Sequence, residues 1–230
     1  MSLIQKTRTR KPIKMKDSKK YADKLLKEFR SLKREHGKVA KPKYEFSTDA
    51  MIYAIVSENM TDSAAIAAIK KLSRHFVDWN DLRVSRVEEI VDVLGKDSSE
   101  NRAVAETLTQ SLNTIFNKYD VVNLDALKEA GKRQAKALLE KLLPSSRFVI
   151  NYTVLTALDG HAIPLTPKML DYLKGNELIQ SDAAIEEIEG FLDRQISAQQ
   201  AYEFYAVFRH ASESAKANDK KNDKKETKKQ

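Results

Sequence analysis

Cysteine is absent from this chain of 230 residues, and its absence excludes several kinds of site. Disulfide bonds, thiolate zinc sites and cysteine-bound iron–sulfur clusters all need that side chain. Histidine could bind a metal instead, but the four histidines do not have the spacing of a ligand motif: they are His36, His75, His161 and His210. We therefore expect no metal ion and no iron–sulfur cofactor.

Long apolar runs are also absent. No segment approaches the ~18 apolar residues of a membrane span, and the N-terminus lacks the apolar core of a signal peptide. P-loops, dinucleotide fingerprints and nucleophile elbows are missing as well. These absences favour a soluble intracellular protein that has no membrane partner.

The net charge of +8 is unevenly distributed along the chain. Residues 1–43 carry 16 Lys and Arg against 4 Asp and Glu, and residues 216–230 carry 7 against 3. The body, 44–215, carries 18 against 26 and is therefore acidic. We expect three parts: a basic N-terminal arm with an amphipathic helix, a helical domain, and a basic disordered tail. Basic arms suit a polyanion such as nucleic acid, although the tail could simply keep the chain soluble.

Every periodic segment repeats apolar residues at helical spacing, and none alternates as a strand does. In the first helix, Tyr21, Leu25, Phe29 and Leu32 form one apolar stripe among basic faces, and Gly37 ends it. The pattern predicts an all-α, two-lobed protein of about ten helices. They are expected at 17–36, 47–59, from Thr61 or Asp62 onward, 85–95, 99–118, 124–141, 147–158, 167–174, 182–194 and 198–212.

Local signals mark several of these boundaries. We expect Ser47 to cap the second helix and either Thr61 or Asp62 to cap the third. Thr166, followed by Pro167, should cap the helix at 167–174. Ser85 and Glu88 have the spacing of a capping box, in a helix that stops at Gly95. The segment FVDWNDLR (76–83) is predicted to be a loop whose tryptophan fills the core.

Three segments in order resemble the endonuclease III-like superfamily of helix-hairpin-helix DNA glycosylases. They are VSENMTDSAAIAAIKKL at 56–72, the helix at 85–95, and 142–169. In the third, LLPSSRFVI aligns with the family's Leu-Pro-Gly-Val-Gly-x-Lys-Thr-Ala pattern, and PLTPKM aligns with Pro-Val-Asp-Thr-His-Val. The resemblance covers roughly 45–212 and implies two helical lobes with a cleft for a flipped-out base.

The same alignment places Phe148 at the family's catalytic lysine and Thr166 at its catalytic aspartate, 18 residues apart as in the family. A Schiff-base route needs a lysine amine, and a water route needs a carboxylate. Neither side chain supplies one. The resemblance therefore implies a degenerate member without catalytic residues, in which Thr166 keeps only a capping role.

The DNA-binding hairpin is altered too. Pro144, Ser145 and Ser146 occupy the Gly-Val-Gly positions, where the family's backbone N–H groups meet a phosphate. Ser145, Ser146 and Arg147 could still hold a phosphate, or a serine could simply cap the next helix. Asn59 aligns with the glutamine that fills the gap left by the flipped base.

We thus expect a DNA-binding protein whose partner is duplex DNA, either intact or damaged. RNA is another possible partner. The nucleic-acid contacts would come mainly from the N-terminal arm: Lys6, Arg8, Arg10, Lys11, Lys14 and Lys16. One alternative is an active glycosylase or lyase with relocated groups such as Lys132 and Arg133. Another is a protein-interaction module with unknown protein partners. The expected location is cytoplasmic, on the nucleoid if the source is bacterial.

Overall fold

The computed structural model describes residues 18–143 and 146–226, with side chains as far as Ala215. Within these ranges the chain forms helices and loops but no strand, which confirms the predicted all-α class. The helices are α1 (Ser18–His36), α2 (Ser47–Ser57), α3 (Asp62–His75), α4 (Trp79–Val84), α5 (Val87–Leu94), α6 (Ser99–Tyr119), α7 (Ala126–Glu129), α8 (Lys132–Leu142), α9 (Arg147–Ala157), α10 (Pro167–Gly175), α11 (Ile185–Gln195) and α12 (Ala201–Glu226).

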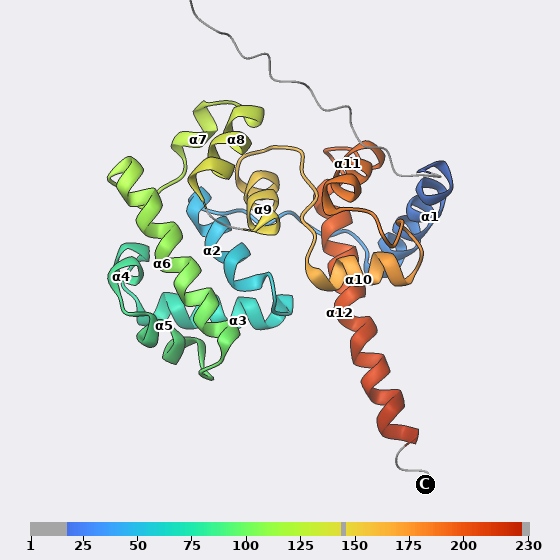
Figure 1. Ribbon diagram of the computed structural model, residues 1–230, viewed down its shortest axis with the longest axis horizontal. Helices are drawn as coiled ribbons and strands as arrows, with labels where there is room; N and C mark the ends of the chain where they lie inside the picture. Colours follow the sequence, from blue (N-terminus) through green and yellow to red (C-terminus); the bar gives the residue numbers. More distant parts are fainter. Residues whose placement is uncertain (1–17, 144–145, 227–230) are drawn as a thin grey trace, which may run out of the picture.

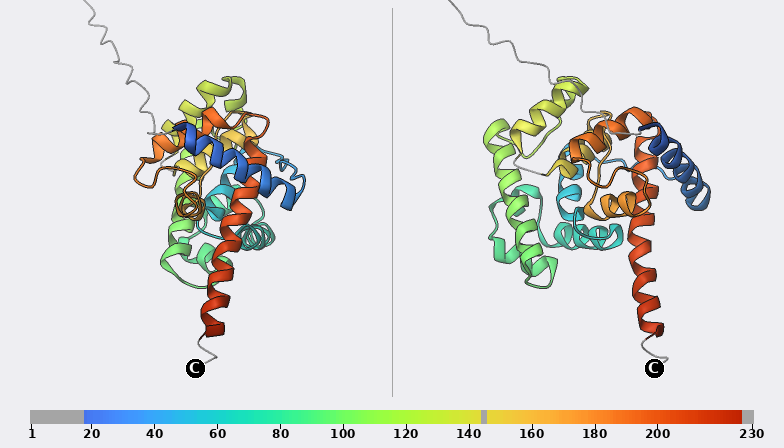
Figure 2. Two further views of the ribbon diagram at one scale, coloured as in Figure 1. Left: turned by 90° about the vertical axis from the view of Figure 1, so that its right-hand side faces the viewer. Right: turned by 45° about the vertical axis from the view of Figure 1, so that its right-hand side comes forward.

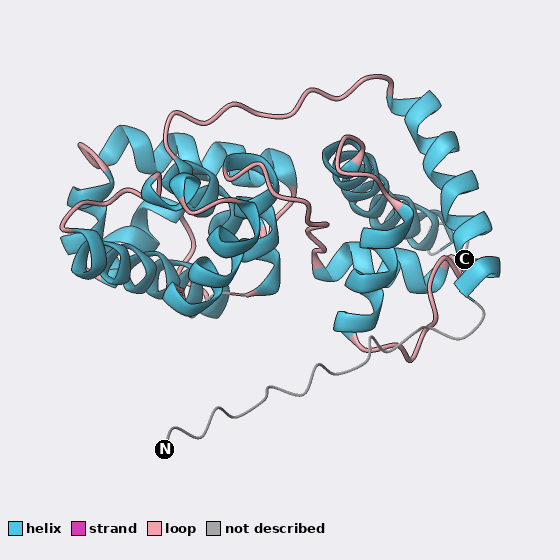
Figure 3. Cartoon of the chain, turned by 90° about the horizontal axis from the view of Figure 1, so that it is seen from above, coloured by secondary structure: helices cyan, strands magenta, loops and turns pink. Residues whose placement is uncertain are grey.

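These helices form two lobes, as predicted (Figures 1 and 3). The first lobe is built from the continuous run α2 to α9, and the second combines α1 with α10, α11 and α12. The loops 37–46 and 158–166 cross from one lobe to the other. Because α9 also contacts α12, the two lobes share a packed boundary.

Two helices that are buried over most of their surface, α2 and α9, form the centre of the first lobe. The side chains of Ala50, Met51 and Ile52 in α2 are fully buried, and every residue of α9 from 148 to 156 is buried. Helices this rich in apolar side chains are buried, so α2 and α9 pack on each other and α2 also contacts α3 and α6.

Helix α1 is an integral part of the second lobe. Its apolar stripe is buried as predicted, and Phe29 stacks edge-on with Phe204 of α12 at a ring-centroid distance of 5.3 Å. Gly37, at φ +69°, ends the helix by donating its N–H to the carbonyl of Lys33. Figure 2 shows α1 against the near end of α12, whose far end projects from the body as a single helix.

The predicted loop at 76–83 is wrong in part, because residues 79–84 form the short helix α4. Asp78 caps it by accepting a hydrogen bond from the Asp81 amide at 2.7 Å, and Asp81 in turn accepts one from the Val77 amide at 3.0 Å. The two aspartates thus satisfy the backbone N–H groups of Val77 and Asp81 at the start of the helix. Trp79 packs against the core and donates its indole N–H to Asp49 at 2.7 Å.

The expected caps at Ser85 and Ser47 are also wrong. Ser85 terminates α4 by donating its hydroxyl to the Asp81 carbonyl, and α5 starts after Arg86. Ser47 is the first residue of α2, and its hydroxyl and amide both bind Asp125 instead, at 2.6 and 2.9 Å. Thr61, by contrast, caps α3 as predicted.

The helix predicted at 124–141 is broken. Gly131 has φ +77°, a conformation that a helix does not contain, and it separates α7 from α8. The last helix continues beyond its predicted end at 212 as far as Glu226, through part of the basic tail. Together with α4, the break at Gly131 explains why the described residues contain twelve helices rather than about ten. None of the helices described is both long and apolar enough to cross a membrane.

Candidate functional site

The helical hairpin at the centre of the sequence resemblance is formed by α8 and α9, which contact each other. Leu139 of α8 and Leu143, directly after it, are buried. Ser146 caps α9 by accepting a hydrogen bond from the Val149 amide at 3.2 Å. Pro144 and Ser145 lie outside the described residues. At this turn Ser146 therefore has the capping role that was the alternative to phosphate binding.

Arg147 is paired with carboxylates of the same chain, although about half of its side chain is exposed. Its guanidinium binds Glu189 through two nitrogens and Glu186 through a third, at 3.2 Å for the Glu186 pair. The hydrogen bonds that Arg147 donates to Glu189 raise the pKa of its guanidinium above the usual value. Asn151 donates to the same Glu189 carboxylate at 2.9 Å, and that glutamate is only 8% exposed. Arg147 thus links α9 in the first lobe to α11 in the second, and a phosphate would have to compete with both carboxylates.

Phe148, which the sequence resemblance aligns with the family's catalytic lysine, is 3% exposed and belongs to a group of rings that we call the aromatic cluster. The cluster joins the loop 37–46, α2, α9 and α12, and its members are Tyr44, Tyr53, Phe148, Tyr152, Tyr202 and Tyr205. Ring centroids of Phe148 lie 5.9 Å from Tyr152 and 6.3 Å from Tyr205.

The cluster provides packing and not a base. Burial raises the pKa of Tyr152 far above its usual value, so its hydroxyl stays protonated near neutral pH. That hydroxyl forms a hydrogen bond of 2.7 Å with the hydroxyl of Tyr44. No nucleophile of the amine or thiolate type belongs to the cluster, whose polar atoms are phenolic hydroxyls.

A buried arginine lies beside this cluster. Arg209 is 3% exposed and donates to the carbonyls of Ser57 and Met60 at 2.9 and 3.1 Å, to the Tyr205 hydroxyl, and to Glu213 at 2.9 Å. A buried charge is tolerated when it is paired and fully hydrogen-bonded, and all three guanidinium nitrogens have an acceptor here.

Glu213 extends the network into the first lobe. Both of its carboxylate oxygens accept the Asp62 amide at 3.1 Å, at the start of α3, and the Asp62 side chain accepts the Tyr53 hydroxyl. The network therefore ties α12 to the end of α2 and the start of α3. Arg209 and Glu213 were not predicted from the sequence. Their i,i+4 spacing was the only local signal, because the other partners of Arg209 are about 150 residues away.

Thr166, which the sequence resemblance aligns with the family's catalytic aspartate, is 4% exposed and caps α10. Its hydroxyl accepts a hydrogen bond from the Met169 amide at 3.2 Å, and Pro167 follows at the first helical position, as predicted. The side chain thus performs the capping role expected of it and carries no charge that could stabilise a cationic sugar.

Asn59 and Ser146 lie at the same pocket. It encloses about 530 Å³ and is formed where α2 ends and where α6 and α9 begin. The charged residues of this pocket are both acidic, Glu58 and Glu100. Burial raises the pKa of Glu58, although a hydrogen bond from Ser146 opposes the shift. This side of the hairpin turn is therefore electrostatically unfavourable for a phosphate.

The basic residues predicted to bind nucleic acid lie elsewhere. Lys6, Arg8, Arg10, Lys11, Lys14 and Lys16 fall outside the described residues. The helix that follows them, α1, buries its apolar stripe on α12 and leaves its basic side chains at the surface, among them Lys19, Lys20 and Lys27. Lys132 and Arg133 are exposed in the first turn of α8, at the opposite end of that helix from the hairpin turn.

No family model matches the sequence, and no curated protein matches it at a significant level. Solved structures do match the fold. A trapped covalent intermediate of endonuclease III with DNA has a TM-score of 0.61 and 17% sequence identity, over 83% of this chain and 82% of that one. The Clostridium acetobutylicum 8-oxoguanine glycosylase/lyase, solved with double-stranded DNA, has a TM-score of 0.66 and 13% identity, over 87% and 71%. A thermostable thymine-DNA glycosylase has a TM-score of 0.59 and 11% identity, over 85% of each chain. The chain has the fold of the helix-hairpin-helix DNA glycosylases.

Proposed function

We propose that this protein binds duplex DNA without excising bases from it. The observation that carries the proposal is the combination of a DNA glycosylase fold with an aromatic ring and a capping hydroxyl at its two catalytic positions. Phe148 is packed inside the aromatic cluster and Thr166 is hydrogen-bonded to the start of α10. Neither route to base excision has its required group at these positions.

The charge distribution supports contact through the N-terminal part of the chain. The body is acidic, whereas residues 1–43 carry a net charge of +12. The structures of similar fold include glycosylases solved with DNA, and we carry that partner over to this chain. Lysines and arginines that meet phosphates release counterions, so this binding is salt-dependent and largely independent of sequence.

The test compares the full chain with a variant in which the six lysines and arginines between residues 6 and 16 are replaced by glutamine. Each protein is titrated at several salt concentrations into two labelled duplexes, one intact and one with a stable abasic-site analogue. We expect the variant to bind both duplexes more weakly. The slope of log binding constant against log salt concentration should become shallower by up to about five. The replacement leaves α1 in place, because removing α1 would expose Phe204 and Phe208.

The same samples test for chemistry. Natural abasic DNA should remain uncut, and borohydride should trap no covalent complex, because only a lysine Schiff base is captured. Failure to retard duplex DNA even at low salt would reject the proposal.

The alternative is a lyase with a relocated lysine such as Lys132. It requires trapping that disappears in the Lys132→Arg variant, in which the charge remains but the amine does not. A biological phenotype that survives loss of the N-terminal charges would instead favour a protein-interaction module.

A further inference from the structure

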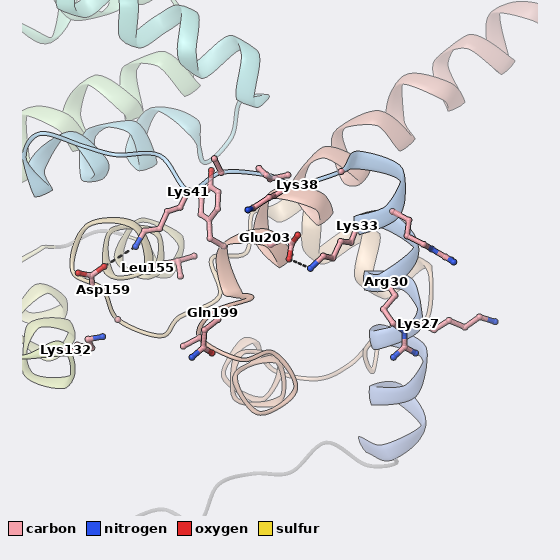
Figure 4. Close-up of a pocket in the computed structure, with 17 residues that line it drawn as sticks. Lys27, Arg30, Lys33, Lys38, Lys41, Lys132, Leu155, Asp159, Gln199 and Glu203 are labelled. Carbon is pink, nitrogen blue, oxygen red and sulfur yellow. Dashed lines mark hydrogen bonds and ion pairs between the residues drawn. The ribbon is translucent and has the colours of Figure 1, made fainter.

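A second concave surface lies at the end of the hairpin opposite its turn, and we call it the basic groove. It encloses about 1290 Å³ between the two lobes, beneath residues 37–41 of the crossing loop. One wall is α1, and the opposite wall is formed by the start of α8 and the end of α9. The start of α12 also lines the groove (Figure 4). Helix α9 has 11 residues, so about 16 Å of helix separates the groove from the hairpin turn.

The groove carries a large excess of positive charge. Seven lysines and arginines line it, against two carboxylates. Both carboxylates are already paired, since Lys41 binds Asp159 at 3.2 Å and Lys33 binds Glu203 at 2.6 Å. The other five cations form no ion pair within the described part of the chain: Lys27, Arg30, Arg34, Lys38 and Lys132.

This concentration of charge contrasts with the acidic body around it. Like charges gathered in a concave site repel one another, and the low-dielectric walls focus their field on whatever enters. An anionic ligand would relieve the repulsion. The groove is therefore the strongest candidate for an anion site among the surfaces that the structure describes.

The arrangement of the cations fits an extended chain of phosphates better than one small anion. Lys27, Arg30 and Arg34 follow one another at helical spacing, and the rise of the helix over the seven steps from 27 to 34 is about 10 Å. That length equals the rise of about three nucleotides along one strand. The enclosed volume also exceeds the roughly 300–1,000 Å³ of small-molecule sites.

The floor of the groove offers apolar surface beside the line of charge. Val39, Leu155 and Tyr202 line it, and Tyr202 is partly exposed while it packs on the aromatic cluster. Sites for single-stranded nucleic acid combine a basic groove that follows the backbone with an aromatic ring on which a base stacks. In a duplex the bases are already stacked on one another, so this apolar floor has no use there.

We propose that the basic groove binds a segment of single-stranded nucleic acid, with phosphates on Lys27, Arg30, Arg34 and Lys38 and a base against Tyr202. The proposal rests on the proposed nucleic-acid binding but assigns a different site and a different form of the ligand. Duplex contacts come from the N-terminal arm, and the groove takes a strand that is unpaired.

The test uses the full chain and a labelled oligonucleotide of about 15 nucleotides, single-stranded or annealed into a duplex. The groove variant is Lys27→Gln with Arg34→Gln. The matched control is Lys70→Gln with Arg74→Gln, an exposed lysine and arginine on α3 that do not line the groove. We expect the groove variant to bind the single strand at least about fivefold more weakly and the log–log salt slope to fall by about 1.4, with the control unchanged.

The ring is tested separately. Tyr202→Phe should keep single-strand affinity, and Tyr202→Leu should lower it about fivefold or more. Thermal unfolding of each variant shows whether the fold is intact; if Tyr202→Leu does not fold, the surface variant at 27 and 34 still decides the matter.

Four outcomes would overturn the inference. Wild-type protein that binds the duplex but no single strand removes the groove assignment and leaves the proposed function standing, whereas binding to neither removes both. Equal losses on the duplex and the single strand would make the groove part of the duplex surface. Poly-glutamate that displaces the oligonucleotide as well as an unlabelled oligonucleotide of equal charge would identify an acidic protein as the ligand.

Discussion

The two ends of the α8–α9 hairpin have opposite electrostatic character. At the turn, the pocket that contains Asn59 and Ser146 is lined by Glu58 and Glu100, and the nearby Arg147 is held by carboxylates of α11. At the far end, Lys132 joins a groove with five more cations than anions. The same pair of helices therefore opposes a phosphate at one end and attracts one at the other.

This contrast separates scaffold from site. The turn end keeps the capping hydroxyls and the close helix packing that hold the hairpin together, with Phe148 as part of the core. The groove end depends on long exposed side chains that contribute little to packing. Substitutions at the turn should therefore mainly change stability, and substitutions in the groove should mainly change binding.

The largest change in stability should come from placing at each end of the hairpin the residue type of the other end, a lysine at Phe148 and a phenylalanine at Lys132. Phe148→Lys would place an ammonium among buried rings, with no carboxylate in the aromatic cluster to pair with it, and would remove the packing of Phe148. We expect a loss of at least about 3 kcal/mol in unfolding free energy, measured by urea denaturation, and no borohydride trapping. The reciprocal change Lys132→Phe, at an exposed position, should alter stability by only about 0.5 kcal/mol.

A Phe148→Lys protein as stable as the wild type would mean that the cluster opens readily to solvent. If such a protein also formed a Schiff base with abasic DNA, the turn end would still bind the lesion. The turn end would then lack activity only because residue 148 is phenylalanine.

The sequence predicts those parts of the molecule whose cause is local. The apolar stripe of α1, the Thr61 and Thr166 caps and the end of α1 at Gly37 each depend on residues within a few positions. The errors arise where one local signal competes with another. Ser85 and Glu88 have capping-box spacing, but Asp78 and Asp81 begin a helix just before them, and Ser85 is used to end it.

The parts that were not predictable depend on distant residues. Ser47 does not cap α2 because Asp125, 78 positions away, binds its hydroxyl. Arg209 donates to the carbonyls of Ser57 and Met60. The residues that line the basic groove range from Lys27 to Glu203 in the sequence. Helical spacing indicates that α1 has a basic face, but only the packing of the two lobes brings that face opposite Lys132.

A smaller effect should decide the role of Arg147, which the sequence analysis proposed as a phosphate ligand. Arg147→Gln would leave the buried Glu189 with Asn151 as its remaining partner, and we expect a loss of about 1–2 kcal/mol because the arginine is half exposed. Adding Glu189→Gln should recover part of this loss in a double-mutant cycle. Duplex affinity at constant salt should be unchanged.

The control for this variant is Arg133→Gln, which removes an exposed arginine from the other helix of the hairpin. If Arg147→Gln weakened DNA binding more than Arg133→Gln while stability stayed constant, Arg147 would be a phosphate ligand. The turn would then share in binding, and the two ends would differ less than their charges suggest.

The smallest effect concerns the carboxylate at the turn. Burial raises the pKa of Glu58 in the folded protein, so between the unfolded and folded pKa values the folded chain holds more protons and stability falls as pH rises. Glu58→Gln should therefore match the wild type below about pH 4 and unfold at a higher temperature near pH 7. Glu129→Gln, at an exposed glutamate of α7, serves as the charge-matched control. If Glu58→Gln instead unfolded at a lower temperature than the wild type near pH 7, with the gap closing towards acid, the Glu58 anion would be stabilised in place, and the turn would then oppose a phosphate more strongly than its burial indicates.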